Sequence, residues 1–179
     1  TADHLLSADE DSLYSGQVIG AWAARYISIP APDELETEHQ VVANLGEEGY
    51  TTQIKSGNHY FVVDEPVAVG GNNFGPTPYE LISAALAACT SITIQMYARR
   101  KKWQLENVET HVSYSKEHAK DCSQCDSDTA KIETFKRYIS IKGMLEEKQR
   151  KRILQIADRC PVHRTLSSQA SIHTESKFD

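Results

Sequence analysis

The segment from residue 81 to residue 98 is the longest apolar stretch of the chain, and it restricts the fold more than any other feature. Thr77 followed by Pro78 is a typical helix start, so we expect one long helix from about Pro78 to about Lys101. Polar side chains interrupt the stretch at Ser83, Thr90, Ser91, Thr93 and Gln95. A basic run, residues 99–102, follows it. This pattern predicts a buried helix of a soluble protein and no membrane partner.

Alternating segments on both sides of this helix predict β-strands. We expect a three-stranded meander, two further strands and a final strand, at residues 39–45, 50–55, 59–63, 108–114, 132–141 and 171–178. A second amphipathic helix is expected over residues 146–159. Because strands and helices are mixed without regular alternation, the predicted fold class is α+β.

The N-terminal part of the chain differs from the rest. Apolar residues recur at close to helical spacing between Ser7 and Tyr26, and Ser7 is a suitable N-cap. Residues 27–38 hold two prolines and a cluster of acids, which is typical of a linker. We therefore expect an N-terminal amphipathic helix with its linker, residues 1–37, and a main domain, residues 38–179.

Charge and cysteine content exclude several classes of protein. The 19 basic residues against 25 acidic ones give a net charge of -6, so we expect no nucleic-acid partner. Four cysteines are too few for a disulfide scaffold in 179 residues, and no secretory signal is visible, so a cytoplasmic protein is expected. Thr1 is not an initiator methionine, which leads us to expect further sequence upstream.

Two cysteines lie in contexts that suit thiol chemistry. Cys89 lies among small residues of the predicted long helix, although it could equally be a small buried hydrophobe. Cys160 precedes Pro161, and if a short helix begins there, the helix dipole lowers the pKa of the Cys160 thiol. One thiolate could then attack an electrophilic oxygen or sulfur, and the other thiol could resolve the product. His163 could serve as a base or cation, or be a surface residue.

Cys122 and Cys125 form a CxxC motif with His118 just before it. A structural zinc site needs four ligands, and His111 or His163 would have to complete this one. The alternative is a solvated loop with two incidental thiols, because no second CxxC is present.

Two longer motifs carry a resemblance to a known family. The stretch GGNNFGPTPYELISAALAACTSITIQMYARRKKW, followed near the end by ADRCPVHRTL, resembles the OsmC/Ohr superfamily of thiol-dependent peroxidases, over about residues 39–178. The resemblance implies an α+β fold that exists as an intertwined homodimer, with two long central helices packed against antiparallel sheets. It also implies active sites at the subunit interface.

The resemblance further implies reduction of organic hydroperoxides, with no cofactor required. Cys89 would be the peroxidatic thiol and Cys160 the resolving one, and a dithiol such as a lipoylated protein would reduce their disulfide. The family's peroxidases carry a glutamate directly after the helix-opening proline, where this chain has Tyr79, with Glu80 one step later. We take Glu80 as a candidate catalytic residue, and Tyr79 and His163 as candidates for binding the substrate.

A second departure concerns an arginine. The family's peroxidases draw an arginine from the N-terminal strands to hold the thiolate, and this chain has none between Arg25 and Arg99. Lys55 or His59 could substitute for it.

The first segment, ADHLLSADEDSLYSGQVIGAWAARYI, is similar to the C-terminal end of an α/β-hydrolase, with His4 at the place of the hydrolase's histidine. The alternative is an N-terminal helix that docks on the dimer. Our leading hypothesis is a two-cysteine hydroperoxide reductase. The alternatives are a non-enzymatic module that binds an apolar ligand or senses redox state, and a zinc-stabilised accessory domain of a hydrolase fusion.

Overall fold

The computed structural model describes residues 9–23, 35–118 and 131–176. The chain divides into two compact units. The first comprises Thr1–Gly46 with Thr52–Phe61, and the second comprises Glu47–Thr51 with Val62–Asp179. The predicted division before residue 38 differs from this one, because the first unit also contains residues 38–46 and 52–61.

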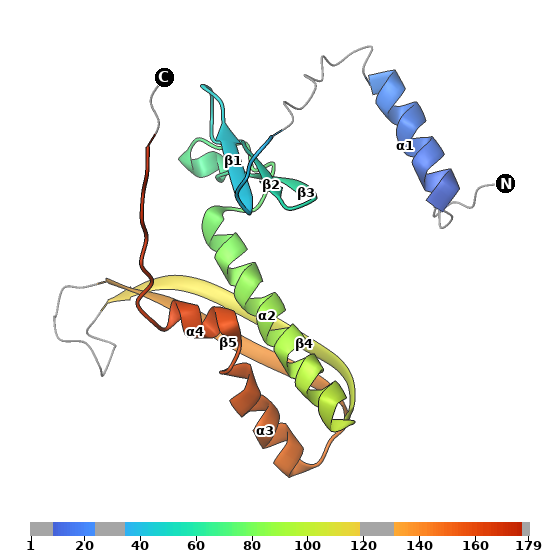
Figure 1. Ribbon diagram of the computed structural model, residues 1–179, viewed down its shortest axis with the longest axis vertical. Coiled ribbons are helices and arrows are strands. Elements are labelled where there is room, and N and C mark those ends of the chain that lie inside the picture. Colours follow the sequence, from blue (N-terminus) through green and yellow to red (C-terminus); the bar gives the residue numbers. More distant parts are fainter. Residues whose placement is uncertain (1–8, 24–34, 119–130, 177–179) are drawn as a thin grey trace. The chain divides into compact units, whose positions relative to one another are not determined.

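The first unit holds helix α1, Asp9–Ala23, and most of a three-stranded sheet. Strands β1 (Val41–Leu45), β2 (Thr52–Ser56) and β3 (His59–Val63) follow each other in the order β1-β2-β3 (Figure 1). The meander is therefore confirmed, with its first two strands starting two residues later than predicted. The proposed N-cap of α1, Ser7, lies outside the described residues.

Helix α1 was expected to pack through an apolar face. Its large apolar side chains are exposed, at Tyr14, Val18, Ile19 and Trp22. The predicted helix is thus formed in its central part, and its packing stays a prediction.

The second unit is built on helix α2, Pro78–Lys101, as the sequence predicts. The Thr77 hydroxyl accepts a hydrogen bond from the Glu80 amide at 3.2 Å, and the Glu80 carboxylate accepts one from the Thr77 amide at 2.7 Å. This reciprocal pair satisfies two of the amide groups that a helix start leaves without partners. By length and composition α2 could also cross a membrane, and 22% of its most apolar window is buried inside the chain.

The loop before α2 is organised by a buried carboxylate. Asp64, which is 1% exposed, accepts hydrogen bonds from the Thr51 hydroxyl at 2.9 Å and from the amides of Glu65, Asn72 and Phe74 at 2.8 to 3.3 Å. Burial alone would raise the pKa of Asp64, but these four donors together lower it. The turn leading to the helix start is therefore fixed by local hydrogen bonds.

Strands β4 (Gln104–His118) and β5 (Lys131–Met144) form one long antiparallel ribbon. Both strands extend beyond their predicted bounds at each end. The sequence prediction covered the alternating apolar middle, whereas the polar ends pair through the backbone, which every residue type can do. At the far end the pairing of Lys116 with Glu133 adds an ion pair of 3.2 Å.

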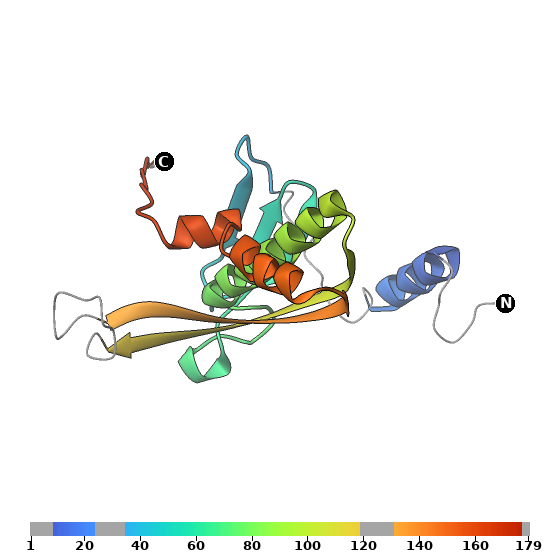
Figure 2. The ribbon, with the colours of Figure 1, turned by 90° about the horizontal axis from the view of Figure 1, so that it is seen from below.

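Two further helices complete the second unit, α3 (Glu147–Ala157) and α4 (Pro161–Leu166). Figure 2 shows α2, α3 and α4 on one face of the β4–β5 ribbon. The core lies between them, where Ile94, Ile153 and Ala157 are at most 1% exposed. Cys160 falls in the short turn between α3 and α4 and is also fully buried.

The predicted final strand, residues 171–178, is wrong over the part that the structure describes. Residues 171–176 have no regular structure and are exposed. A strand needs a hydrogen-bonded neighbour to satisfy its backbone, and the described strands pair only within the β1-β2-β3 sheet and the β4-β5 ribbon.

Candidate active site

The fold brings together two cysteines that are far apart in the sequence. Cys89 lies in the middle of α2, and Cys160 is the N-cap residue of α4. The two thiols shift each other's pKa, which places them next to each other, and both are free. Cys160 is fully buried, whereas Cys89 is partly exposed. The sequence prediction of a thiol pair and the predicted N-cap position of Cys160 are both found in the structure.

Several donors converge on the Cys160 sulfur. Burial would raise the pKa of this thiol, but hydrogen bonds from Cys89, from the backbone of His163 and Val162, and from the Thr90 side chain lower it overall. The two amides belong to the first turn of α4, so they stabilise a negative charge as the start of a helix does. Cys160 is therefore the thiol of the pair that ionises more readily.

Cys89 shows the opposite shift. Burial raises the pKa of the Cys89 thiol, and the hydrogen bond to Cys160 raises it further, outweighing the donors from Val162 and Thr93. When the pair loses its first proton, the charge therefore resides on Cys160 and the remaining proton on Cys89. In the singly ionised pair, the buried sulfur therefore carries the charge and the partly exposed sulfur keeps the proton.

An arginine that the sequence reasoning missed lies next to this pair. Arg137 of β5 donates a hydrogen bond to the Thr90 hydroxyl at 3.1 Å, and the Thr90 side chain in turn lowers the pKa of Cys160. The alternation of β5 could have indicated this arginine. Side chains of a strand alternate between two faces, and Arg137 falls on the less exposed face together with Phe135 and Ile139. A largely buried cation at such a position requires hydrogen-bonding or charged partners.

A small pocket of about 230 Å³ adjoins the same elements. Its wall combines apolar and polar side chains from α2, β5 and α4, namely Leu86, Glu133, Phe135, Arg137, His163, Leu166 and Ser167. His163, a predicted substrate-binding residue, therefore lines this cavity. Leu86, which lines it too, lies one helical turn before Thr90 on α2.

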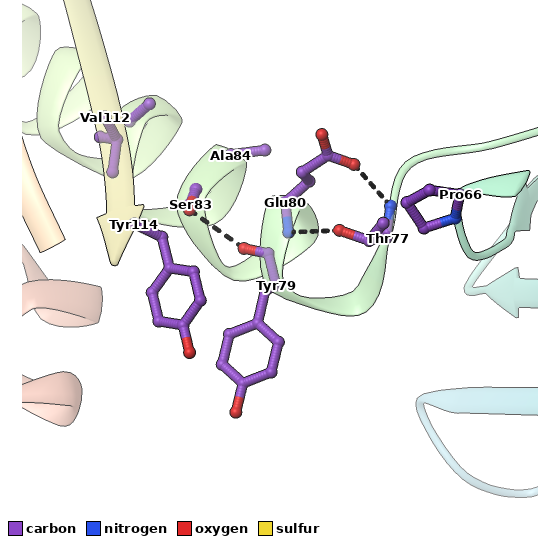
Figure 3. Close-up of a pocket in the computed structure, with 9 residues that line it drawn as sticks. Pro66, Thr77, Tyr79, Glu80, Ser83, Ala84, Val112 and Tyr114 are labelled. Carbon is purple, nitrogen blue, oxygen red and sulfur yellow. Dashed lines mark hydrogen bonds between the residues drawn. The ribbon is translucent and has the colours of Figure 1, made fainter. Parts of the chain in front are cut away.

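The other predicted residues of α2 lie at a second, larger pocket of about 630 Å³ at the helix start (Figure 3). Tyr79 stacks on Tyr114 with ring centroids 4.4 Å apart. Glu80 is held in the helix cap by Thr77. Nine residues separate Glu80 from Cys89, roughly 13.5 Å along the helix axis. The structure thus places the Glu80 carboxylate in the cap and away from the thiol pair.

The remaining candidates divide into two groups. Lys55 and His59, the suggested substitutes for the missing arginine, lie in the first unit, where Lys55 Nζ is 5.5 Å from the Tyr60 ring centroid. Cys122, Cys125 and the side chain of His118 lie outside the described residues. Within the part of the chain that is described, no group of three or more His, Cys, Asp and Glu residues could hold a metal ion.

Comparison with known families identifies the class of this fold. The sequence model of the OsmC-like protein family matches residues 70–175. The chain therefore belongs to the OsmC-like protein family. The match contains both Cys89 and Cys160. It does not reach the N-terminal segment, so the resemblance of that segment to a hydrolase stays a prediction. A comparison with curated proteins finds no match.

Solved structures share the fold at low sequence identity. A protein of Psychrobacter arcticus is 18% identical with a TM-score of 0.58, over 74% of this chain and 90% of its own. An OsmC-like protein of Mycoplasma pneumoniae is 21% identical with a TM-score of 0.56, over 74% and 89%. An organic hydroperoxide resistance protein of Elizabethkingia anophelis is 17% identical with a TM-score of 0.52, over 73% and 89%. The predicted α+β OsmC-like fold is confirmed.

Proposed function

We propose that this protein reduces organic hydroperoxides through the Cys89 and Cys160 thiols. The observation that carries the proposal is the pair of neighbouring free thiols, of which Cys89 is partly exposed and Cys160 is buried with a lowered pKa. Membership of the OsmC-like family supports it, as does the shared fold with a hydroperoxide resistance protein.

In the first step, Cys89 passes its proton to the Cys160 thiolate, and its sulfur attacks the terminal oxygen of the hydroperoxide. The S–O bond forms as the O–O bond breaks, and the alkoxide leaves as an alcohol with the proton from Cys160. The peroxide is reduced by two electrons, and Cys89 becomes a sulfenic acid. Cys89 takes this role because its sulfur is the more accessible one, and Cys160 supplies the nearby base.

In the second step, the Cys160 thiolate attacks the sulfur of the Cys89 sulfenic acid. The S–S bond forms, the S–O bond breaks, and hydroxide leaves and is protonated to water. An external dithiol, such as a lipoylated protein, then reduces the disulfide by exchange and restores both thiols. The cycle uses no metal or cofactor, and any zinc bound by His118, Cys122 and Cys125 would be structural.

The apolar part of the substrate fits the surroundings of the pair. Leu86, Phe135 and Leu166 give the small pocket beside Thr90 an apolar wall, while Arg137 and His163 give it polar groups. We assign this pocket to the organic group of the peroxide, in the reducing environment of the cytoplasm.

The proposal includes a homodimer. Helix α2 is as apolar as a membrane-spanning helix. Three of its large apolar side chains are nevertheless exposed, Ile82 to 36%, Ile92 to 58% and Met96 to 67%. Covering such a surface with a second copy of the chain is favourable, because burial of apolar area drives association.

A peroxide assay tests the proposal. The reduced wild-type protein should consume many equivalents of cumene hydroperoxide when dithiothreitol is supplied. The rate should rise with pH until Cys160 is ionised, and this rise should lie below the pH at which a free thiol titrates, because the pKa of Cys160 is lowered. Peroxide loss no faster than with dithiothreitol alone would exclude the enzymatic function.

A non-enzymatic binding module is the second candidate. The 630 Å³ pocket at the start of α2, with the stacked rings of Tyr79 and Tyr114, favours it. Saturable binding of a fluorescent fatty acid without peroxide turnover would select this alternative. The third hypothesis, a zinc-stabilised accessory domain, is supported only by the sequence motif of Cys122 and Cys125.

A further inference from the structure

We propose that Arg137 is a positioning residue of the thiol site, which directs the proton of the Thr90 hydroxyl toward the Cys160 sulfur. The use of this arrangement in peroxide reduction rests on the proposed function. Its effect on the thiols can be measured without any peroxide.

Three hydrogen bonds fix the guanidinium of Arg137. One terminal nitrogen donates to Thr90 Oγ1 at 3.1 Å and to the Ala157 carbonyl at 3.1 Å, and the other donates to Asp158 Oδ1 at 2.7 Å. The side chain of Arg137 is 13% exposed. A planar guanidinium with acceptors on several sides has little freedom to turn away.

The direction of the Thr90 proton follows from the number of donors and acceptors. A threonine hydroxyl has one proton to donate and two lone pairs to accept with. The guanidinium of Arg137 has only N–H donors, so toward Arg137 the Thr90 oxygen can act only as an acceptor. The hydroxyl proton therefore stays available for donation, and the Thr90 side chain lowers the pKa of Cys160, as a donor to the sulfur does. A fully buried hydroxyl has no solvent to bond instead, and Thr90 is 0% exposed.

Arg137 also holds the backbone that carries Cys160. The Ala157 carbonyl accepts both the Arg137 nitrogen at 3.1 Å and the Cys160 amide at 3.2 Å. One side chain of β5 thus holds both the Thr90 hydroxyl on α2 and the turn after α3 that carries Cys160.

The charge of Arg137 is not the main agent in this arrangement. Asp158, whose side chain is 65% exposed, forms an ion pair with the guanidinium and offsets its charge. A lysine at this position would keep a positive charge but could not span Thr90, Ala157 and Asp158 with one rigid group. We therefore expect Arg137→Lys to resemble the loss of the arginine.

The test measures ionisation of the thiols in the full-length, reduced protein. Ultraviolet thiolate absorbance is followed against pH, and the part of the rise that is absent from Cys160→Ser is assigned to Cys160. In Arg137→Met and Thr90→Val, this rise should move up by about one pH unit, because one hydrogen bond to a charged group is worth about a tenfold change in an equilibrium constant. Thr90→Ser, which keeps the hydroxyl, should restore the wild-type titration.

The chain offers a matched control in Arg152. This half-buried arginine of α3 donates a hydrogen bond to the Tyr97 hydroxyl at 3.3 Å. Tyr97 lies on α2, as Thr90 does, but two turns beyond Cys89. Arg152→Met should leave the Cys160 titration within about 0.3 pH unit of the wild type, a twofold change in the equilibrium constant. Circular dichroism verifies folding of each variant. If Arg137→Met does not fold, the comparison of Thr90→Val with Thr90→Ser decides.

An unchanged Cys160 titration in a folded Arg137→Met and in Thr90→Val would overturn the proposal. An equal shift in Arg152→Met would do so too, because it would indicate a general effect of removing an arginine. If the titration responds as expected but wild-type protein does not turn over peroxide, the positioning role stands and the proposed function fails.

Discussion

Replacing Cys89 with serine should lower multiple-turnover reduction of cumene hydroperoxide by more than about 10³-fold. The serine hydroxyl keeps nearly the same shape but is a far weaker nucleophile at neutral pH. The Cys160 thiolate remains in this variant, yet its sulfur is fully buried and meets the peroxide poorly. Consumption of peroxide by the protein, with dithiothreitol as reductant, measures the loss.

The control for this variant is Ser91→Ala, which also removes a polar atom from α2. Ser91 lies two residues from Cys89 and hydrogen-bonds Thr110 at 2.8 Å. Its loss should reduce the rate by less than about fivefold, as expected for one structural hydrogen bond. If Cys89→Ser retains a tenth or more of wild-type activity, the first attack belongs to another thiol.

Replacing Cys160 with serine should leave one turnover and then stop the cycle. This variant loses the base Cys160, but the pKa of Cys89 is then no longer raised by it, so Cys89 still reduces one equivalent of peroxide. Its sulfenic acid has no neighbouring thiolate to attack it. Further peroxide then oxidises Cys89 to the sulfinic acid, which dithiothreitol does not reverse. Steady-state activity should therefore fall by at least about 10²-fold while the first equivalent is still consumed.

Rapid mixing with one equivalent of peroxide separates these two parts. Mass spectrometry should then find one added oxygen on the Cys89 peptide, and two after excess peroxide. Sustained turnover by Cys160→Ser would mean that external thiols resolve the sulfenic acid directly. An unmodified Cys89 peptide in that variant would contradict its role as the peroxidatic residue.

Local chemistry in the sequence was enough to predict the helix starts. Thr77 before Pro78 gave the start of α2, and Cys160 before Pro161 gave the N-cap of α4. Both depend on a few adjacent residues, since capping and the fixed backbone angle of proline are local effects. The same holds for β3, whose bounds match the alternation between a Gly-Asn turn and Asp64.

Contacts between segments that are distant in the chain could not be predicted from the sequence. Arg137 and Thr90 are 47 residues apart, and no spacing rule relates a strand position to a helix position across that distance. The division of charge between Cys89 and Cys160 depends on the amides of α4 that converge on them, so the sequence could predict an ionised Cys160 but not a raised pKa at Cys89. The extended ends of β4 and β5 likewise depend on pairing rather than on composition.

The account depends on the Cys89 and Cys160 sulfurs reacting with each other. Treating the reduced wild-type protein with one equivalent of cumene hydroperoxide, followed by non-reducing digestion and mass spectrometry, tests this directly. The predicted result is a disulfide-linked pair of peptides containing Cys89 and Cys160, about 2 Da lighter than their sum because two thiol hydrogens are lost. Peroxide consumption that leaves these two peptides unlinked, with a disulfide between other cysteines or none, would contradict it.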